Sequence, residues 1–409
     1  AVYISNFRCG PDSFIWHYIT EELKGKPFLH LEVDEHSADA GMVTRIEAFL
    51  DSLKGSEQNE KKEIEIIRPR PSPAEPPVDR TLYFPYMHDG AYFVAAAARS
   101  VGIPSEVLPR QTEKDIALGR KYTSSRECFP MICTTGSFLK KLMEPGSDPS
   151  KMSFFMPDHN GPCRFGQYNQ FQRILFDRLG FSEAELVTPS NDTSYADLAG
   201  NRSQRFRINA WKGFVAFDYI RKLYRETRPY ELSAGDTEAV YQAALKKTEA
   251  SIENNCRGLR RILVETAHEF MSVKVDKSRR KPVIAVIGEV YMRDNAGCNG
   301  NIANRLEALG AEVTIGPFSE WITYSTHRYT RDSRWKNDTR GVIKSKIQAI
   351  GQEVIVDYLL RGINKYTDTT KDVSLHEMLE LSNRYVSEFY DGDPPIAMGT
   401  SAALAQRGV

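Results

Sequence analysis

Short apolar runs alternate with segments of helical periodicity at the start of this chain. Residues 2–6 predict a buried strand, residues 12–24 a helix and residues 28–34 a second strand. The next segment, residues 40–53, has apolar side chains at helical spacing. This order favours parallel pairing, because parallel strands need a crossover connection. Two strands are too few to close a core, so the segment is only half of a doubly wound domain.

A change of composition follows this segment. Residues 55–80 pass from charged to proline-rich sequence, which predicts an extended, semi-rigid linker. After the linker the pattern restarts, with a strand at 81–87, a helix at 91–102 and a strand at 105–109. We therefore expect a new domain to begin at about residue 81.

The rest of the chain predicts more helix and a second strand–helix–strand unit. From about residue 112 the pattern becomes more helical, and a helix is expected after Pro130. The further predicted elements are a strand at 152–158, a helix at 169–180, a helical stretch at 207–273, a strand at 282–292, a helix at 301–310, a strand at 311–317 and helix again over 339–390. Together these patterns indicate an α/β protein with a substantial helical portion.

Composition narrows the function classes. The 54 basic side chains balance 54 acidic ones, so no net positive field exists to bind nucleic acid. No run of about 18 apolar residues occurs and no secretion signal is visible, so we expect a cytoplasmic protein without a membrane partner. Six cysteines are too sparse for a disulfide scaffold, and in a reducing compartment they should be thiols or metal ligands.

Three cysteines share one local setting. Cys9, Cys128 and Cys163 each lie in or beside a turn flanked by Gly or Pro, with a helix following. A helix N-terminus favours a thiolate, which lowers the thiol pKa and makes a better iron ligand. Such loops could converge, because open α/β sheets gather ligands beyond the carboxyl ends of their strands. The alternative is that each cysteine is a small buried thiol.

The other three cysteines have different settings. Cys133 lies in an apolar helical run, which favours core packing. Cys256 is expected in the middle of a charged helix without an obvious partner. Cys298 follows a strand in a setting like that of the first three cysteines, so it is the best candidate for a fourth ligand.

Several polar side chains near these loops are further candidates. Three cations could stabilise an anionic cluster or a phosphate, or could simply form surface pairs: Arg126, Arg164 and Arg293. His159 could be a proton donor or a solvated loop histidine. Glu289 and Tyr291 leave a strand on opposite faces, so only one of them could face a given cleft as an acid–base group.

Familiar catalytic motifs are missing from the sequence. It contains no ATPase-type phosphate loop, no Gly-x-Gly-x-x-Gly fingerprint, no zinc-protease helix and no nucleophile elbow. The cysteine loops are therefore the main chemical signal.

Four segments carry a family resemblance: "ISNFRCGPDSFI", "LHLEVDEHSADAGMVTRIEAFLDS", "RECFPMICTTGSF" and "GPCRFGQYNQFQR". They resemble the iron–sulfur units related to 2-hydroxyacyl-CoA dehydratases, which occur in large tandem proteins known as CoA-enzyme activases. The resemblance is strong over residues 1–54 and 81–175 and returns at 283–315.

The resemblance implies Rossmann-like (flavodoxin-like) parallel-sheet subdomains around a cysteine-bound [4Fe–4S] cluster. A separate ATP-hydrolysing activator would reduce this cluster one electron at a time. By motif match Cys9, Cys128 and Cys163 would be the ligands, which leaves one iron free for a CoA-linked or small-molecule substrate or for a bridging sulfide. Some relatives carry a double-cubane cluster that uses more cysteines, and six are numerically enough. A non-catalytic cluster-binding or scaffold unit is the alternative to a dehydratase or reductase component.

The resemblance also gives expected domain boundaries and assembly. The expected divisions are residues 1–54, the closing strand–helix module of a preceding Rossmann-like unit; residues 55–80, the linker; residues 81–205, a cluster-binding domain; residues 206–280, a helical segment; and residues 281–409, a second, truncated Rossmann-like domain. The chain is then expected to be a dimer or part of a longer tandem protein. In that case Cys9 could serve a different cluster from Cys128 and Cys163.

Overall fold

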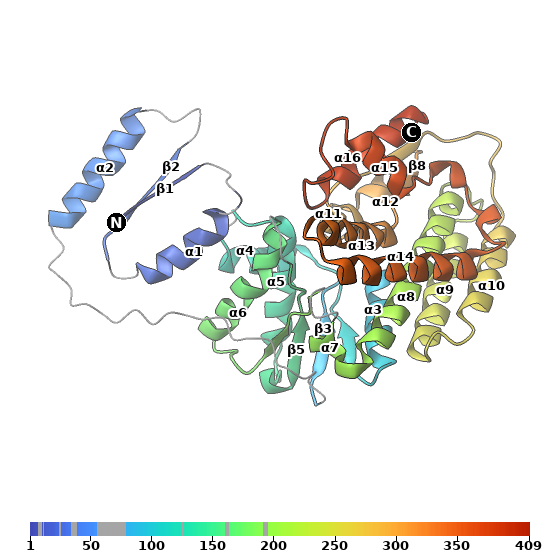
Figure 1. Cartoon of the computed structure of the whole chain (residues 1–409), viewed down its shortest axis with the longest axis horizontal. Coiled ribbons are helices and arrows are strands. Elements are labelled where there is room, and N and C mark those ends of the chain that lie inside the picture. The colour runs from blue at the N-terminus through green and yellow to red at the C-terminus, as the bar shows by residue number, and fades with distance from the viewer. Residues whose placement is uncertain are drawn as a thin grey trace.

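The fold contains parallel sheets and many helices (Figure 1). This computed structural model describes residues 1–6, 10, 12–23, 26–33, 39–54, 79–124, 126–159, 163–190 and 195–409. Within these residues all the paired strands run parallel, in sheets ordered β1-β2, β4-β3-β5-β6 and β7-β8. The predicted α/β class with a substantial helical portion is confirmed. Residues 55–78, most of the predicted linker, lie outside the described residues.

The first segment forms a small module beside the main body of the molecule (Figure 1). Its elements are β1 (Val2–Asn6), α1 (Asp12–Glu22), β2 (Leu29–Val33) and α2 (Asp39–Lys54). The β1 and β2 strands pair with Ile4 opposite Leu31. No side chain of α2 is buried, whereas Phe14 of α1 stacks on Tyr168 with ring centroids 6.2 Å apart. The α1 helix therefore holds the module against the central domain.

The central domain is built on the four-stranded sheet. Its strands are β3 (Thr81–Phe84), β4 (Ser105–Val107), β5 (Met152–Phe155) and β6 (Glu185–Val187). Its helices are α3 (Gly90–Arg99), α4 (Glu113–Tyr122), α5 (Phe129–Leu142), α6 (Tyr168–Arg178) and α7 (Ala196–Ala199). The chain passes from β3 to β4 on one side and then to β5 on the other. The carboxyl ends of β3 and β5 therefore form a topological switch point, where α/β proteins bind ligands.

Paired glycines bring α4 and α5 into close contact. A Cβ atom on Gly119 would overlap the carbonyl oxygen of Ile132, and one on Gly136 would overlap that of Asp115. Thr112 and Asp115 form a capping box at the start of α4. This contact fixes α5, which carries both Cys128 at its start and Cys133.

Three long helices follow the central sheet: α8 (Ser203–Thr227), α9 (Asp236–Glu253) and α10 (Leu259–Ser272). The sequence predicted Cys256 in the middle of a helix, and this is wrong. Cys256 lies in the turn between α9 and α10, where Asn255, Cys256 and Gly258 have φ angles of 54°, 60° and 73°. Asn and Gly favour this left-handed conformation, so they end α9.

The second strand–helix–strand unit has the predicted order but a shorter first strand. Its elements are β7 (Val283–Val286), α11 (Val290–Asp294), α12 (Ile302–Ala308) and β8 (Glu312–Ile315). Gly288, with a φ of 133°, turns the chain, and α11 replaces the predicted end of the strand. The loop after α11 docks on the central sheet, since the Asn295 side-chain amide donates to the backbone carbonyl of Tyr86 at 3.2 Å and to the side-chain oxygen of Gln111 at 3.0 Å.

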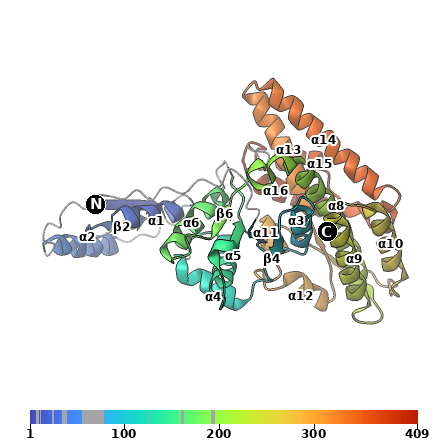
Figure 2. The ribbon, with the colours of Figure 1, turned by 90° about the horizontal axis from the view of Figure 1, so that it is seen from below.

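The C-terminal part is helical. Its helices are α13 (Phe318–Trp335), α14 (Thr339–Leu360), α15 (Leu375–Ser382) and α16 (Pro394–Gln406). The 3-10 turns are η1 (Pro149–Lys151), η2 (Arg164–Gln167), η3 (Gly200–Arg202), η4 (Arg228–Tyr230), η5 (Asn364–Tyr366) and η6 (Thr369–Lys371). The α13 and α14 helices project from the body as a long hairpin (Figure 2). No helix in the described part of the chain combines the length and apolar character needed to span a membrane.

Candidate functional site

Cys128 lies at the N-terminus of α5. It is the N-cap residue, and its carbonyl oxygen accepts a hydrogen bond from the Met131 N–H at 3.0 Å. Pro130 stands in the first turn, where its missing N–H costs no helical hydrogen bond. The thiol is partly buried and packs against the core cluster that contains Tyr168. Burial, and then the Cys128 thiol, raise the pKa of the Tyr168 hydroxyl group.

Cys163 occupies the same kind of position in the loop after β5. It is the N-cap residue of η2, and α6 begins directly after that turn. Gly166 is required here, because a Cβ atom would overlap the carbonyl oxygen of His159. The structure brings this loop to the start of α5, so that Cys128 acts electrostatically on the Cys163 thiol. The role of both residues as iron ligands remains a prediction.

Two carboxyl groups from the C-terminal half lie near these thiols. Glu289 is the N-cap residue of α11 and accepts hydrogen bonds from the N–H groups of Tyr291 at 3.1 Å and Met292 at 2.8 Å. Asp393 is the N-cap residue of α16 and accepts from the Trp321 indole N–H at 2.9 Å. Burial raises the pKa of both carboxyl groups. The sequence named Glu289 as a candidate but missed Asp393, whose approach to Cys163 depends on the tertiary fold.

The surroundings raise the pKa of the Cys163 thiol, which corrects the expectation of a lowered value. Partial burial has the largest effect, although part of Cys163 is exposed to solvent. The Phe165 N–H lowers the pKa, but Cys128, Asp393 and Glu289 raise it further. One backbone N–H is too weak to offset desolvation together with three acidic neighbours. The iron-free protein therefore favours a neutral thiol here.

Arg164 connects the Cys163 loop with the first module. Its Nη1 donates to the Ser13 hydroxyl at 3.1 Å, and a Cβ atom on Gly10 would lie 3.3 Å from the Arg164 side chain. Gly10 directly follows Cys9 in the sequence. Cys9, the third predicted ligand, lies outside the described residues. The first module thus reaches the Cys163 loop through Arg164.

The predicted cations have structural partners. Arg126 pairs with Glu32 of β2 at 3.3 Å and lies 5.7 Å from the ring centroid of Trp16. Arg293 is buried beside Asp294, with 3.4 Å between the paired atoms. Arg126 thus forms a surface pair, the alternative that the sequence left open, whereas the pair of Arg293 is buried, which corrects the expectation of a surface pair for that residue.

The residues present fit a thiolate-bound metal in part. Among the residues that the structure describes, no group of three Cys, His, Asp or Glu side chains could hold a metal ion. Two thiols at Cys128 and Cys163 supply two sulfur donors, and Cys9 lies outside this described set. Thiolates are the ligands of iron–sulfur clusters, so the donor chemistry agrees with such a cluster although the described set is incomplete.

Cys133 and Cys298 form a second thiol pair in an apolar setting. Cys133 is fully buried, and Cys298 packs against its cluster with Ile116 and Tyr291. The two thiols pack together, and Tyr291, whose hydroxyl group donates to the Tyr86 carbonyl at 3.5 Å, belongs to the same cluster. Core packing is confirmed for Cys133. The prediction that Cys298 joins the first three cysteines is wrong, because docking of the loop at Asn295 turns its thiol toward Cys133.

Three further side chains were predicted as acid–base candidates: Glu289, Tyr291 and His159. Glu289 lies on the side of Cys128 and Cys163, whereas Tyr291 lies with Cys133 and Cys298. Both residues belong to α11 and its N-cap rather than to a strand. His159 is half-buried rather than solvated, and burial lowers its pKa, with Arg328 lowering it further. A neutral His159 at pH 7 is a poor acid.

A buried polar cluster lies behind Arg293, between α8 and the second unit: His88, Asp218, Arg221, Asp294 and Glu320. Burial lowers the pKa of His88 to about 4 and raises that of Glu320 to about 7. Each keeps one side-chain atom without a hydrogen bond in the described chain. Phe217 stacks on the His88 ring at 4.4 Å, which covers it from solvent.

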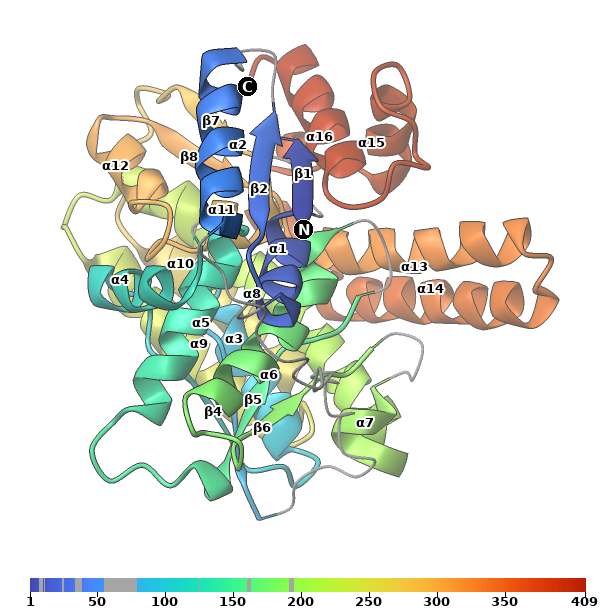
Figure 3. The ribbon, with the colours of Figure 1, turned by 90° about the vertical axis from the view of Figure 1, so that its left-hand side faces the viewer.

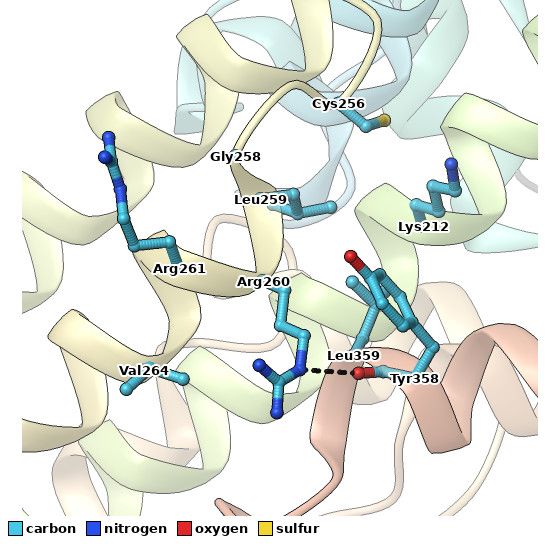
Figure 4. Close-up of a pocket in the computed structure, with 9 residues that line it drawn as sticks. All are labelled: Lys212, Cys256, Gly258, Leu259, Arg260, Arg261, Val264, Tyr358 and Leu359. Carbon is cyan, nitrogen blue, oxygen red and sulfur yellow. Dashed lines mark hydrogen bonds between the residues drawn. The ribbon is translucent and has the colours of Figure 1, made fainter.

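A pocket lies far along the chain from the first thiol pair, at the α9–α10 turn (Figure 4). Its lining includes Lys212, Cys256, Arg260 and Tyr358. Burial raises the pKa of Cys256 to about 11, and the thiol donates to Asn209 at 3.5 Å. This thiol is therefore protonated at neutral pH and is a poor nucleophile.

Comparison with protein-family models, with curated proteins and with solved structures found no match for this chain.

Proposed function

We propose that this chain is the iron–sulfur cluster-bearing component of a low-potential reductase or 2-hydroxyacyl-CoA dehydratase-like system in the cytoplasm. Its electrons would come from a separate ATP-hydrolysing activator. One observation carries the proposal: the turns of Cys128 and Cys163 meet, since Arg164 donates to the Arg126 carbonyl at 3.3 Å, and Cys128, Asp393 and Glu289 all act electrostatically on the Cys163 thiol. The family resemblance of the same two turns agrees with it.

The acidic setting supports a cation at this place. Asp393, Glu289 and Cys128 all raise the pKa of the Cys163 thiol, so four acidic groups share one region. A bound metal ion reverses this effect, because its charge stabilises thiolate and carboxylate forms. Iron would therefore be held by Cys128 and Cys163, with Cys9 as the proposed third ligand. The contact between Gly10 and Arg164 supports a shared site for all three cysteines.

When bound, the cluster would supply one-electron transfer at low potential. The side chains around it would set its surroundings. Tyr168 is 5 % exposed, and its hydroxyl group is held beside Cys128 and would donate to a ligand sulfur. Hydrogen bonds to cluster sulfurs tune the potential. Glu289, whose pKa is raised by burial, can hold a proton near the site and is the proposed acid–base group for a bound substrate.

Anaerobic purification followed by iron and sulfide analysis tests the cluster. We expect wild-type protein to bind iron and acid-labile sulfide, and the variants Cys128→Ala and Cys163→Ala to lose most of both. Cys256→Ala, a change at a thiol hydrogen-bonded to Asn209, is the matched control and should keep the cluster. A chain that stays colourless after reconstitution with iron and sulfide would refute the proposal.

Activity assays then separate an enzyme from a scaffold. A reconstituted chain should turn over a CoA-linked or small-molecule substrate only with the activator and ATP. Glu289→Gln should keep the iron content and lower turnover by about 10²-fold, the usual contribution of a general acid. A protein that holds iron and never turns over substrate would instead be a non-catalytic cluster-binding unit.

A further inference from the structure

The α14 helix has one covered face and one open face. It packs through Gly341, Ser345, Gln352 and Leu359, which are buried. The Gln352 carbonyl accepts a hydrogen bond from the Trp211 indole at 3.3 Å, and the Gln348 amide donates to Thr326 of α13 at 3.0 Å. These contacts fix which side of α14 faces the protein. The hairpin that it forms with α13 extends well beyond the sheet domains (Figure 3).

The open face carries an apolar stripe: Ile343, Ile347, Ile350, Val354 and Tyr358. These side chains are between 55 % and 66 % exposed. Their spacing of four, three, four and four residues places them on one side of a helix. Single exposed apolar residues are ordinary on a protein surface, but a continuous stripe of five marks an interaction site.

Charges beside the stripe are separated along the helix. Arg340 and Lys346 lie in the N-terminal half, whereas Glu353 and Asp357 lie in the C-terminal half. All four side chains lie outside the buried face of α14. Lys346 and Glu353 flank the stripe on the same side, but a seven-residue step separates them by about 10 Å along the axis. They are therefore too far apart to pair within one chain.

This charge pattern is self-complementary in one orientation only. A second α14 helix that runs antiparallel brings its acidic half against the basic half of the first. With Ile347 of one copy over Ile350 of the other, Lys346 of each copy lies within about 3 Å along the axis of the level of Glu353 of its partner, an offset that the long side chains can span. A parallel pair would instead place like charges together. Two-fold symmetric contacts of this kind are the commonest basis of homodimers.

From the stripe and its charges, we propose that α14 is the dimer interface of this protein and that its occupant is an antiparallel α14 of a second copy. A helix of this length spans about 33 Å, and the two stripes with their flanks can bury on the order of 1,000 Å², the lower limit of a specific interface. Gly351 stands beside the stripe, and a Cβ atom added to it would have no neighbour within 4 Å. A glycine there lowers the helix propensity of α14 and lets a partner helix approach closely. The inference does not rest on the proposed function.

Sedimentation equilibrium on the chain tests the interface. We expect a dimer for the wild type and a monomer for Ile347→Glu, which places a charge at the centre of the buried seam. Leu309→Glu is the matched control, because Leu309 is 87 % exposed and lies outside the stripe, and it should remain dimeric. Circular dichroism should show unchanged helix content in both variants. A monomeric wild type, or a dimeric Ile347→Glu, overturns the proposal.

A charge exchange tests the orientation. Lys346→Glu turns two attractions into two repulsions and should raise the dimer dissociation constant about tenfold, as should Glu353→Lys. The double variant restores opposite charges across the two-fold axis, so its dissociation constant should return to within about threefold of the wild type. Restoration cannot come from within one chain, given the distance between the two residues. A double variant as weak as the single ones overturns the antiparallel arrangement.

Discussion

The two thiol pairs share the helix α5 and differ in almost everything else. Cys128, at the start of the helix, lies with Cys163 among acidic groups and partly in solvent. Cys133, one and a half turns later, is sealed in an apolar cluster with Cys298. Each pair also has a tyrosine hydroxyl beside it, Tyr168 or Tyr291. The neighbours, rather than the residue type, therefore separate a candidate metal site from a packing contact.

The two pairs also differ in how their protons are held. In the second pair, the interaction between the thiols lowers the pKa of Cys298 and raises that of Cys133, so Cys298 should lose its proton first. In the first pair, desolvation and acidic neighbours raise the pKa of Cys163 and keep its proton in place. A bound cation would favour loss of the Cys163 proton, whereas in the second pair the two thiols shift each other's pKa.

The largest effect on stability is expected from a substitution at the contact between α4 and α5, because α5 carries a cysteine of each pair. Gly136→Ala forces a methyl group into the carbonyl oxygen of Asp115 and should separate α4 from α5. We expect a loss of about 3 kcal/mol in the free energy of unfolding, at the upper end of overpacking effects. Urea unfolding measures this loss.

Gly41→Ala, in the exposed helix α2, is the matched control for that change. This glycine is also helical, but a Cβ atom there meets nothing within 4 Å. The same substitution should stabilise the helix by up to about 1 kcal/mol, because Ala has the higher helix propensity. Equal effects of the two changes would show that the α4–α5 contact is not tight.

Removal of one thiol from each pair should change the free energy of unfolding by different amounts. Cys133→Ala leaves a small cavity in an apolar cluster, so we expect a loss of about 1–2 kcal/mol in the iron-free protein. Cys163→Ala removes an exposed side chain and should change the free energy of unfolding by less than about 0.5 kcal/mol. Urea unfolding under reducing conditions compares the two variants. A larger loss for Cys163→Ala would mean that the first pair is the structural one.

The sequence predicted what depends on neighbours along the chain. Cys128 and Cys163 both stand at helix starts because Pro130 and Gly166 specify those turns locally. Apolar runs likewise predicted the strands β7 and β8. The turn at Cys256 was missed because helical periodicity on both sides hides a five-residue break.

What the sequence could not predict depends on contacts between distant segments. Asp393 reaches the first thiol pair through α16, and no local pattern marks that approach. Cys298 was assigned to the wrong pair because Asn295 anchors its loop on Tyr86 and Gln111, far back in the chain. A cysteine turn that resembles a ligand loop locally can thus be turned toward the core by one buried amide.

The smallest expected effects are shifts in the pKa values of Cys163 and Cys298, and they compare the two thiol pairs most directly. In iron-free protein, alkylation of each cysteine followed by mass spectrometry against pH should give a pKa midpoint for Cys163 above that of an ordinary thiol and one for Cys298 below it. Glu289→Gln removes a nearby negative charge, so the Cys163 midpoint should fall. Tyr291→Phe removes a hydroxyl group that lowers the pKa of Cys298, so that midpoint should rise. Each substitution should leave the other thiol unchanged, because the two pairs respond to separate neighbours. If both midpoints move together in either variant, the pairs are electrostatically one site, and the division between metal-binding and structural thiols fails.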